Sequence, residues 1–375
     1  MPTSRAGNGI EPDVQVIIPQ IDGLRGLAIL AVIYQHAFSH GVSQALSAHG
    51  LFPYLEEDGW MGVSLFFILS GFVLARPLIA DPRRLHGMDN VLAFYQNRAK
   101  RLLPLFAIGC FVGYLVNHTS FGSLLLALTT MSMFTATDFY PQINQPFWSL
   151  MLEIWFSMLI PVLIVAAWRF GYWQVLTGVI AIALVTRIVG TQLSFATVLQ
   201  NPVKDSVLGR IDDFMIGVVV ARAHVGGQLR KAPPWLFALG VMFVTVSALG
   251  WDLTLQNKLP AVTRAFLNLA TSTGFACVLM SCLSETSRKA LFLSWWPLRV
   301  AGAMCFSLYC WHYWVMQATN PNSLEIKAAL TFLSVTVGVS LLSYKFIEFP
   351  RRTWRALIRM EGQKMFPIIA GFRRS

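Results

Sequence analysis

The chain has 375 residues, of which 55% are hydrophobic and 13% charged, and Lys and Arg outnumber Asp and Glu by 29 to 18. Soluble domains carry about 25% charged residues, so this composition argues against a soluble globular protein and indicates a polytopic membrane protein. The basic excess lies in short segments between apolar runs, as orientation signals do. Because no basic face with interleaved aromatic residues is present, nucleic-acid binding is not expected.

Eleven apolar runs follow one another along the chain. Each is typical of a membrane helix, because a hydrocarbon core of ~30 Å needs about 20 apolar residues, and the alternation typical of a transmembrane β-barrel is absent. We predict an all-α fold, a bundle of about ten transmembrane helices with eleven as the alternative. The runs lie near 23–39, 60–80, 102–117, 121–135, 147–168, 172–190, 207–221, 235–250, 262–283, 301–318 and 327–346.

Positive charges predict which side of the membrane each connection faces. The segment 76–101 is rich in Arg and Lys and should be cytoplasmic, whereas the acidic residues 56–58 should face outward. A second basic connection begins at Arg222, so an even number of crossings must separate the two cytoplasmic segments. Five apolar runs lie between them. The shortest, 121–135, is predicted to be a partial or re-entrant element, with 207–221 as the other candidate.

The same count places both termini in the cytoplasm and predicts a single membrane domain, 21–348. A short N-terminal segment, 1–20, precedes it and shows no signal-peptide pattern. A basic tail, 349–375, follows it and is too short for a fused soluble esterase domain. The five cysteines have neither metal-ligand nor disulfide-framework spacing, so no metal is predicted.

The first apolar run carries ionisable groups at both ends. Arg25 and His36 are eleven residues apart, which is three helical turns plus about 20°, so both lie on one face, roughly 16 Å apart along the axis. A charge at membrane depth should face the bundle interior or an aqueous cavity, so this stripe predicts a cavity or passage. Asp22 is spaced to pair with Arg25. The alternative is an arginine that snorkels to one interface and a histidine solvated at the other.

Polar residues also interrupt the later runs. Small residues such as Ser70 let helices approach closely, and the spacing of Arg210 and Asp213 predicts a paired structural lock. The motifs are GVSLFFILSGFVLARPL (62–78), FYQNRAKRLLPLF (94–106), WSLMLEIWF (148–156), GRIDDFMIG (209–217), SLYCWHYWV (307–315) and YKFIEFPRR (344–352).

Taken in order, these motifs resemble those of the acyltransferase family 3 membrane proteins, over most of the chain from Asp22 to Arg352. One motif departs from the family pattern: Met-Leu-Glu at 151–153 stands where the family more often has Ser-Val-Glu, with the glutamate retained. The resemblance implies a multi-pass protein of the cytoplasmic (inner) membrane that moves an acyl group, most often acetyl, from cytoplasmic acyl-CoA to a hydroxyl. The implied acceptor contains carbohydrate, such as a surface polysaccharide or a lipid-linked glycan. A small glycosylated metabolite of the macrolide type is the alternative.

The resemblance also assigns residues. His36 corresponds to the essential histidine of the family, Arg25 to its arginine partner, and Arg98 and Arg101 to its cytoplasmic arginine pair. As a neutral imidazole, His36 could deprotonate the acceptor or carry the acyl group covalently, and both mechanisms stay open. The count of membrane crossings places Trp148 and Glu153 near the outer face, where the carboxylate orients the imidazole or else ties helices together.

Three cationic residues, Arg98, Lys100 and Arg101, suit the phosphates of coenzyme A, although positive-inside orientation alone would also explain them. His312 lies inside an apolar run and is either a hydrogen-bonded structural residue or a catalytic one. The rival functional class is a transporter or flippase, in which intramembrane charges mark ion pathways. The internal repeats that such proteins often show are absent from this sequence. A non-catalytic membrane scaffold would not need His36.

Overall fold

The computed structural model describes residues 18–48, 59–193, 201–284, 289–323 and 325–358, and the regular secondary structure in these ranges is helical throughout. The acidic residues 56–58 and most of the predicted N-terminal segment and tail lie outside them. The helices are α1 (Pro19–Ala37), α2 (Ser39–Ala48), α3 (Trp60–Ala80), α4 (Met88–Val116), α5 (Phe121–Leu128), α6 (Phe147–Phe170), α7 (Tyr172–Gln192), α8 (Val207–Val225), α9 (Trp235–Leu255), α10 (Thr263–Cys282), α11 (Lys289–Leu293), α12 (Trp296–Ala303), α13 (Cys305–Thr319), α14 (Ile326–Ser343) and α15 (Trp354–Ile358).

Seven helices in the described ranges are long and apolar enough to cross a membrane, which supports a multi-pass protein. They are α3, α4, α6, α7, α9, α10, and α14 with the π-helical turn Tyr344–Glu348 that extends it. The other three crossings predicted from the sequence correspond to α1 and α8, with 19 residues each, and to α13, with 15. The total of ten and the cytoplasmic location of both termini stay predictions.

The run 121–135 does not form one continuous helix. It divides into α5, which has eight residues, and a 3₁₀ turn at Met131–Phe134, with Thr130 in the left-handed region (φ 59°) between them. Eight residues rise about 12 Å, well short of a ~30 Å hydrocarbon core. The run is therefore a partial element, as its length predicted, whereas the other candidate, 207–221, lies within the continuous helix α8.

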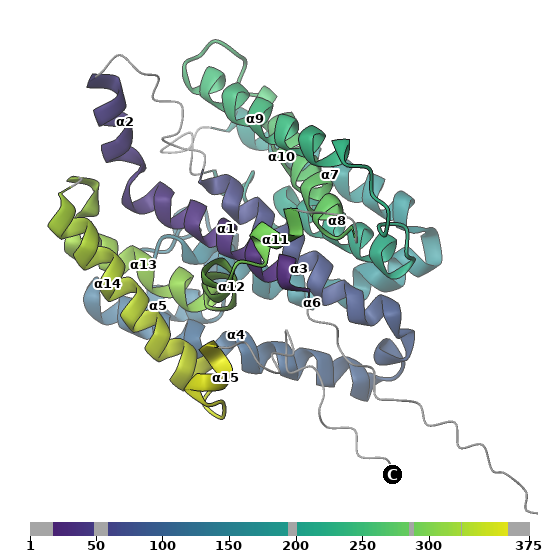
Figure 1. Ribbon diagram of the computed structural model, residues 1–375, viewed down its shortest axis with the longest axis horizontal. Helices are drawn as coiled ribbons and strands as arrows, with labels where there is room; N and C mark the ends of the chain where they lie inside the picture. The colour runs from purple at the N-terminus through teal and green to yellow at the C-terminus, as the bar shows by residue number, and fades with distance from the viewer. Residues whose placement is uncertain (1–17, 49–58, 194–200, 285–288, 324, 359–375) are drawn as a thin grey trace, which may run out of the picture.

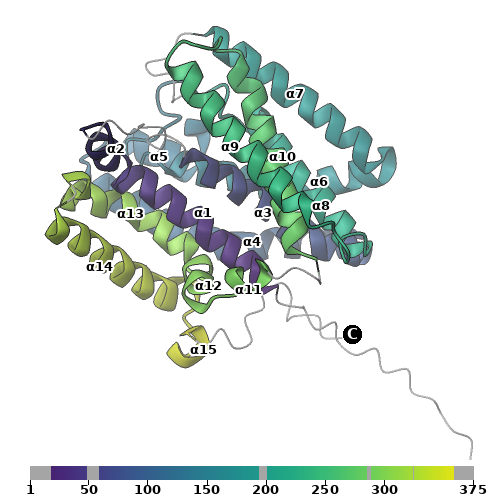
Figure 2. The ribbon, with the colours of Figure 1, turned by 45° about the horizontal axis from the view of Figure 1, so that its top comes forward.

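Helices α1 and α3 occupy the middle of the bundle. In both ribbon views α13 and α14 lie on one side of them and α7, α9 and α10 on the other (Figures 1 and 2). In the most apolar 18-residue stretch of α3, 72% is buried inside the protein. The corresponding share is 22% in α7 and in α14. We infer that α3 is a core helix, while α7 and α14 present most of their surface to lipid.

Glycines let the central helices approach to backbone contact. A Cβ atom on Gly71 of α3 would lie 2.2 Å from the carbonyl oxygen of Phe214, and one on Gly217 of α8 would lie 2.1 Å from that of Ile68. Gly26 of α1 lies equally close to the backbone of α12. Small residues at such crossings are the usual means of tight packing between membrane helices. These contacts fix α1, α3 and α8, which carry the polar residues discussed below.

Helix α8 takes part in two buried ion pairs, one within the helix and one with α7. Arg210 and Asp213 approach to 3.4 Å within α8, and Arg187 of α7 pairs with Asp212 at 2.5 Å. Arg210 also donates a hydrogen bond to Ser64 of α3 (2.9 Å). The predicted pair of Arg210 and Asp213 is therefore present, and hydrogen bonds link it to Ser64 of α3 and to Ser272 of α10.

Candidate active site

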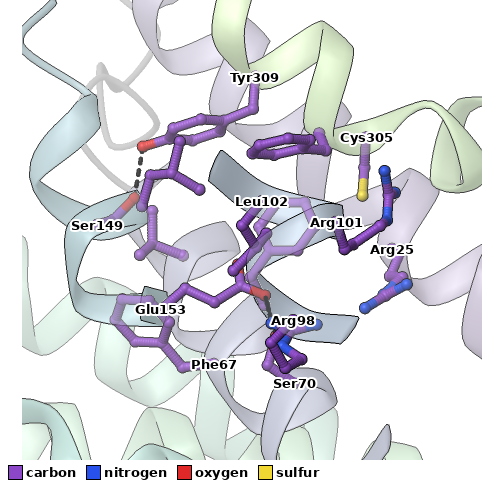
Figure 3. A pocket seen from close by; sticks show the side chains of 14 residues that line it. Arg25, Phe67, Ser70, Arg98, Arg101, Leu102, Ser149, Glu153, Cys305 and Tyr309 are labelled. Atoms are coloured by element: carbon purple, nitrogen blue, oxygen red, sulfur yellow. Dashed lines mark hydrogen bonds and ion pairs between the residues drawn. The ribbon is translucent and has the colours of Figure 1, made fainter. Parts of the chain in front are cut away.

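Two adjacent cavities penetrate the bundle next to α1. The first, which we call the arginine cavity, has a volume of about 630 Å³ including its open mouth (Figure 3). It is lined by Arg25, Val63, Phe66, Phe67, Ser70, Arg98, Arg101, Leu102, Ser149, Leu150, Glu153, Cys305, Phe306 and Tyr309.

The second, which we call the histidine cavity, has a volume of about 920 Å³, again including its open mouth. Arg25 and His36, predicted to share one face of the first helix, each line one of the two cavities, and Val63 and Tyr309 line both. The full lining is Val32, Gln35, His36, Gly59, Trp60, Val63, Tyr140, Gln145, Pro146, Trp148, Lys204, Asp205, Arg210, Trp251 and Tyr309.

A carboxylate and an arginine face each other inside the arginine cavity. Arg98 of α4 donates to an oxygen of Glu153 at 3.1 Å and to the hydroxyl of Ser157 at 2.9 Å. Ser70 of α3 donates to the same carboxylate oxygen at 3.2 Å. In Figure 3 the three side chains Glu153, Arg98 and Ser70 converge from three helices. Glu153 therefore lies beside Arg98 of the segment predicted to be cytoplasmic, and not near the outer face with Trp148 as expected. His36, which Glu153 was predicted to orient, lines the other cavity together with Trp148.

The second member of the predicted arginine pair has a partner from the far end of the chain. Arg101 forms an ion pair with Glu348, which also accepts a hydrogen bond from Ser307. Figure 3 shows the Arg101 side chain extending toward Arg25 and Cys305. Lys100 is exposed and lines neither cavity, so the structure separates it from the two arginines with which it was grouped.

Tyr309 stands between the cavities and is held firmly. Its hydroxyl donates to the carbonyl of Pro146 (2.6 Å) and is hydrogen-bonded to the hydroxyl of Ser149 (2.6 Å). Tyr309 and Val63 line both spaces, so these two residues lie at the boundary between the cavities.

His36 lies among aromatic side chains of α13. The centroid of its ring is 5.3 Å from that of His312 and 5.6 Å from that of Tyr313. His312 is fully buried, and its Nδ1 lies 2.8 Å from the carbonyl oxygen of Tyr309 and 3.1 Å from that of Leu308. The structure thus brings together two histidines that are 276 positions apart in the sequence.

The rest of the histidine cavity combines indole rings with charged groups. The rings of Trp60 and Trp251 are 4.7 Å apart, and the ammonium of Lys204 lies 4.9 Å from the Trp251 centroid. Asp205 accepts a hydrogen bond from Tyr140 (2.8 Å) and lies 3.4 Å from Lys204. Burial lowers the pKa of Lys204, while the Asp205 carboxylate opposes that shift. Sequence patterns did not single out Lys204 or Asp205, because both belong to a short loop without a recognisable motif.

The remaining predicted residues border these sites. Trp148 lines the histidine cavity next to Tyr140, with ring centroids 5.8 Å apart. Asp22 of α1 faces Arg299 of α12 at 3.7 Å, a partner that sequence spacing did not identify. Within the described ranges, no three His, Cys, Asp or Glu side chains gather in a way that could hold a metal ion.

Comparison with known proteins identifies the family. The acyltransferase 3 model, described as an acyltransferase domain, matches residues 18–347. The chain is 23% identical to the O-acetyltransferase OatA of Staphylococcus aureus over 94% of this chain and 59% of that protein. It is 25% identical to the putative peptidoglycan O-acetyltransferase YrhL of Bacillus subtilis, covering 90% of this chain and 55% of YrhL.

A third relative is the peptidoglycan O-acetyltransferase OatA of Listeria monocytogenes, 24% identical over 89% of this chain and 56% of the relative. The chain therefore spans little more than half the length of these relatives. No solved structure matches it. The family model covers the whole membrane bundle and both cavities, and on that match the chain belongs to acyltransferase family 3.

Proposed function

We propose that the protein is an O-acyltransferase of the cytoplasmic membrane that moves an acetyl group from cytoplasmic acyl-CoA to a hydroxyl of a carbohydrate-containing acceptor. The observation that carries the proposal is the placement of Arg25 and His36 on one helix, each lining one of two adjacent cavities. The relatives named as peptidoglycan O-acetyltransferases favour a peptidoglycan glycan strand as the acceptor. A small glycosylated metabolite is the alternative acceptor.

The arginine cavity suits the donor. Its lining contains three guanidinium groups, those of Arg25, Arg98 and Arg101, against one carboxylate, Glu153. Coenzyme A carries several negative phosphates, and guanidinium groups bind phosphate oxygens through paired hydrogen bonds. In the proposed complex the phosphates lie among these arginines at the cytoplasmic side, and the thioester extends toward Tyr309.

The histidine cavity suits the acceptor and the chemistry. Aromatic faces such as those of Trp60 and Trp251 offer apolar contact to a sugar ring, and polar groups such as Gln145 offer hydrogen bonds. His36 takes the proton of the acceptor hydroxyl while that oxygen attacks the thioester carbonyl, and coenzyme A leaves as the thiol. In the covalent alternative the imidazole itself attacks first and passes the acetyl group on.

Substitution of His36 tests this proposal. Purified protein is given labelled acetyl-CoA and muropeptide or glycan-strand acceptors, and acetylated product is measured by mass spectrometry. We expect His36→Ala to lower the rate at least ~100-fold, because general-base or nucleophilic catalysis is lost. His40→Ala is the matched control, since His40 is exposed on the neighbouring helix α2 and lines neither cavity.

Two results would overturn the proposal. One is full acetylation by the His36→Ala variant. The other is transport of a solute or lipid by the native protein with no acetylated product from any acceptor, which would favour the transporter class.

A further inference from the structure

The protonation of His312 follows from its hydrogen bonds. Its Nδ1 lies within hydrogen-bond distance of the carbonyl oxygens of Leu308 and Tyr309. Carbonyl oxygens only accept, so the ring carries its proton on Nδ1. The side chain is fully buried, where an uncompensated charge would be costly, and the ring is therefore neutral. Its Nε2 is left as an acceptor, and this buried atom has no hydrogen-bond partner among the described residues.

The nearest ring that could supply a donor is that of His36. The two centroids are 5.3 Å apart and the ring planes are inclined by 39°. A direct N–H···N bond of about 3 Å between two imidazoles brings their centroids to roughly 5 Å, so the observed separation allows this bond when His36 turns an N–H toward Nε2. Tyr313 packs edge-on against His36 at 5.6 Å, and its hydroxyl is anchored on Gln145 (2.7 Å). His36 is therefore confined between two side chains of α13.

We propose that His312 is a positioning residue that accepts the N–H of His36 on its own Nε2. This inference rests on the proposed function. One nitrogen of His36 is then always protonated and turned toward His312, and the other is left as the free acceptor for the histidine cavity. When the acceptor hydroxyl gives up its proton, that proton goes to the free nitrogen. The second proton stays in place, and its hydrogen bond becomes charge-assisted and stronger.

In this arrangement His312 does for His36 what a carboxylate does for the imidazole of a hydrolase triad, which is to fix tautomer and orientation. Glu153, predicted for that role, binds Arg98 and Ser70 instead. The same free nitrogen would also be the nucleophile if His36 carries the acetyl group, so the inference holds for either mechanism.

A pair of amide substitutions separates positioning from structural anchoring. The amide of His312→Asn reaches about as far as Nδ1 and keeps a donor for the α13 carbonyls, but leaves the Nε2 position empty. The amide of His312→Gln reaches the Nε2 position and presents an oxygen acceptor to His36. We expect His312→Gln to keep kcat within about 5-fold of the native value and His312→Asn to lose about 30-fold or more, with KM for acetyl-CoA unchanged in both.

A kcat for His312→Asn that equals or exceeds that of His312→Gln overturns the inference. A residue that only anchors α13 would tolerate His312→Asn at least as well as His312→Gln, and a donor-binding residue would change KM. His36→Ala is measured alongside. If it is inactive while the two amide variants are equal or reversed in order, the positioning role fails and the proposed function stands. If it is fully active, the proposed function fails.

A second variant keeps the test decisive if either amide variant does not fold. His312→Ala leaves a space the size of an imidazole ring. Free imidazole, which brings an acceptor nitrogen, should raise the rate of this variant at least ~10-fold. Pyrrole has the same shape and donates but has no comparable acceptor, so it should restore none. Equal rescue by both molecules, or by neither, contradicts the positioning role.

Discussion

Glu153 accepts hydrogen bonds from two side chains that belong to different helices, Arg98 of α4 and Ser70 of α3. This single carboxylate therefore links three helices within the arginine cavity. It also balances one of the guanidinium groups, which would be costly to bury alone, since the Arg98 side chain is only 6% exposed. Arg101 is balanced in a similar way by Glu348.

Removing the charge of Glu153 should weaken the fold. Glu153→Gln keeps the shape and one acceptor but leaves the Arg98 guanidinium without its carboxylate. We expect a loss of about 1–3 kcal/mol in the free energy of unfolding, less than for a fully buried pair because the Glu153 side chain is 22% exposed. Thermal unfolding in detergent measures the effect. Glu325→Gln, at an exposed position before α14, is the control, and equal midpoints for the two variants would contradict the expectation.

At this scale, the sequence identified polar residues better than it identified their partners. Arg25, His36 and Glu153 were recognisable because desolvation makes an ionisable group in an apolar run conspicuous. Arg98 and Arg101 lie in a basic segment and were identified by the family resemblance. Their partners were not, because a pair such as Arg101 and Glu348 is separated by 247 positions.

The grouping of Lys100 with the arginine pair illustrates the helical geometry. Residues three apart share a helix face, whereas Lys100 points about 100° away from Arg101. Its exposure in the structure follows from that angle.

Helices α3 and α8 cross with their backbones in contact. Both helices also contribute residues to the lining of the cavities. Val63 and Ser70 of α3 line the arginine cavity, while Arg210 of α8 lines the histidine cavity. Any separation of the two helices would therefore displace lining residues of both cavities.

A methyl group at the crossing tests its importance. In Gly217→Ala the new Cβ would meet the carbonyl oxygen of Ile68 at 2.1 Å, so the helices must separate. We expect a loss of about 1–3 kcal/mol of stability, the usual cost of overpacking, together with reduced acetylation.

Gly178→Ala in α7 is the matched control, because nothing lies within 4 Å of its added Cβ. It should be neutral or stabilising by up to about 1 kcal/mol through helix propensity. The expectation fails if both variants unfold at the native temperature.

Predictions of the helices from the sequence succeeded where a run was long and uniformly apolar, as for α3 and α6. They were less accurate where the backbone breaks for tertiary reasons. The run 301–318 divides at Met304 into α12 and α13, although no proline or glycine follows Ala303 to signal an end. The break lets α12 pack against α1, and only packing between distant segments explains it.

The whole bundle has one consistent predicted orientation. If the segment 76–101 is cytoplasmic, α9 and α10 must be joined on the outer side, since α9 starts just after the basic connection that follows α8. Arg101 and Glu348 then lie toward the cytoplasm, and His36 toward the outside.

Accessibility of single cysteines tests this orientation. His86 and Lys258 are exposed and lie in the two connections concerned. We expect Lys258→Cys to react with a membrane-impermeant maleimide in intact cells and His86→Cys to react only after permeabilisation. The unsubstituted protein is the control for its native cysteines, four of which are buried. Reversed labelling would invert the predicted topology.

The ion pair between Arg101 and Glu348 has a consequence for biosynthesis. The arginine belongs to α4, but its carboxylate is added only when the ribosome reaches residue 348, after most of the membrane helices have been synthesised. Until then the guanidinium of the nascent chain must be solvated by water or bound by lipid headgroups or a chaperone. The ion pair beside the arginine cavity is therefore completed only after α14 has been synthesised, and a ribosome that stalls earlier leaves an inserted but unfinished bundle.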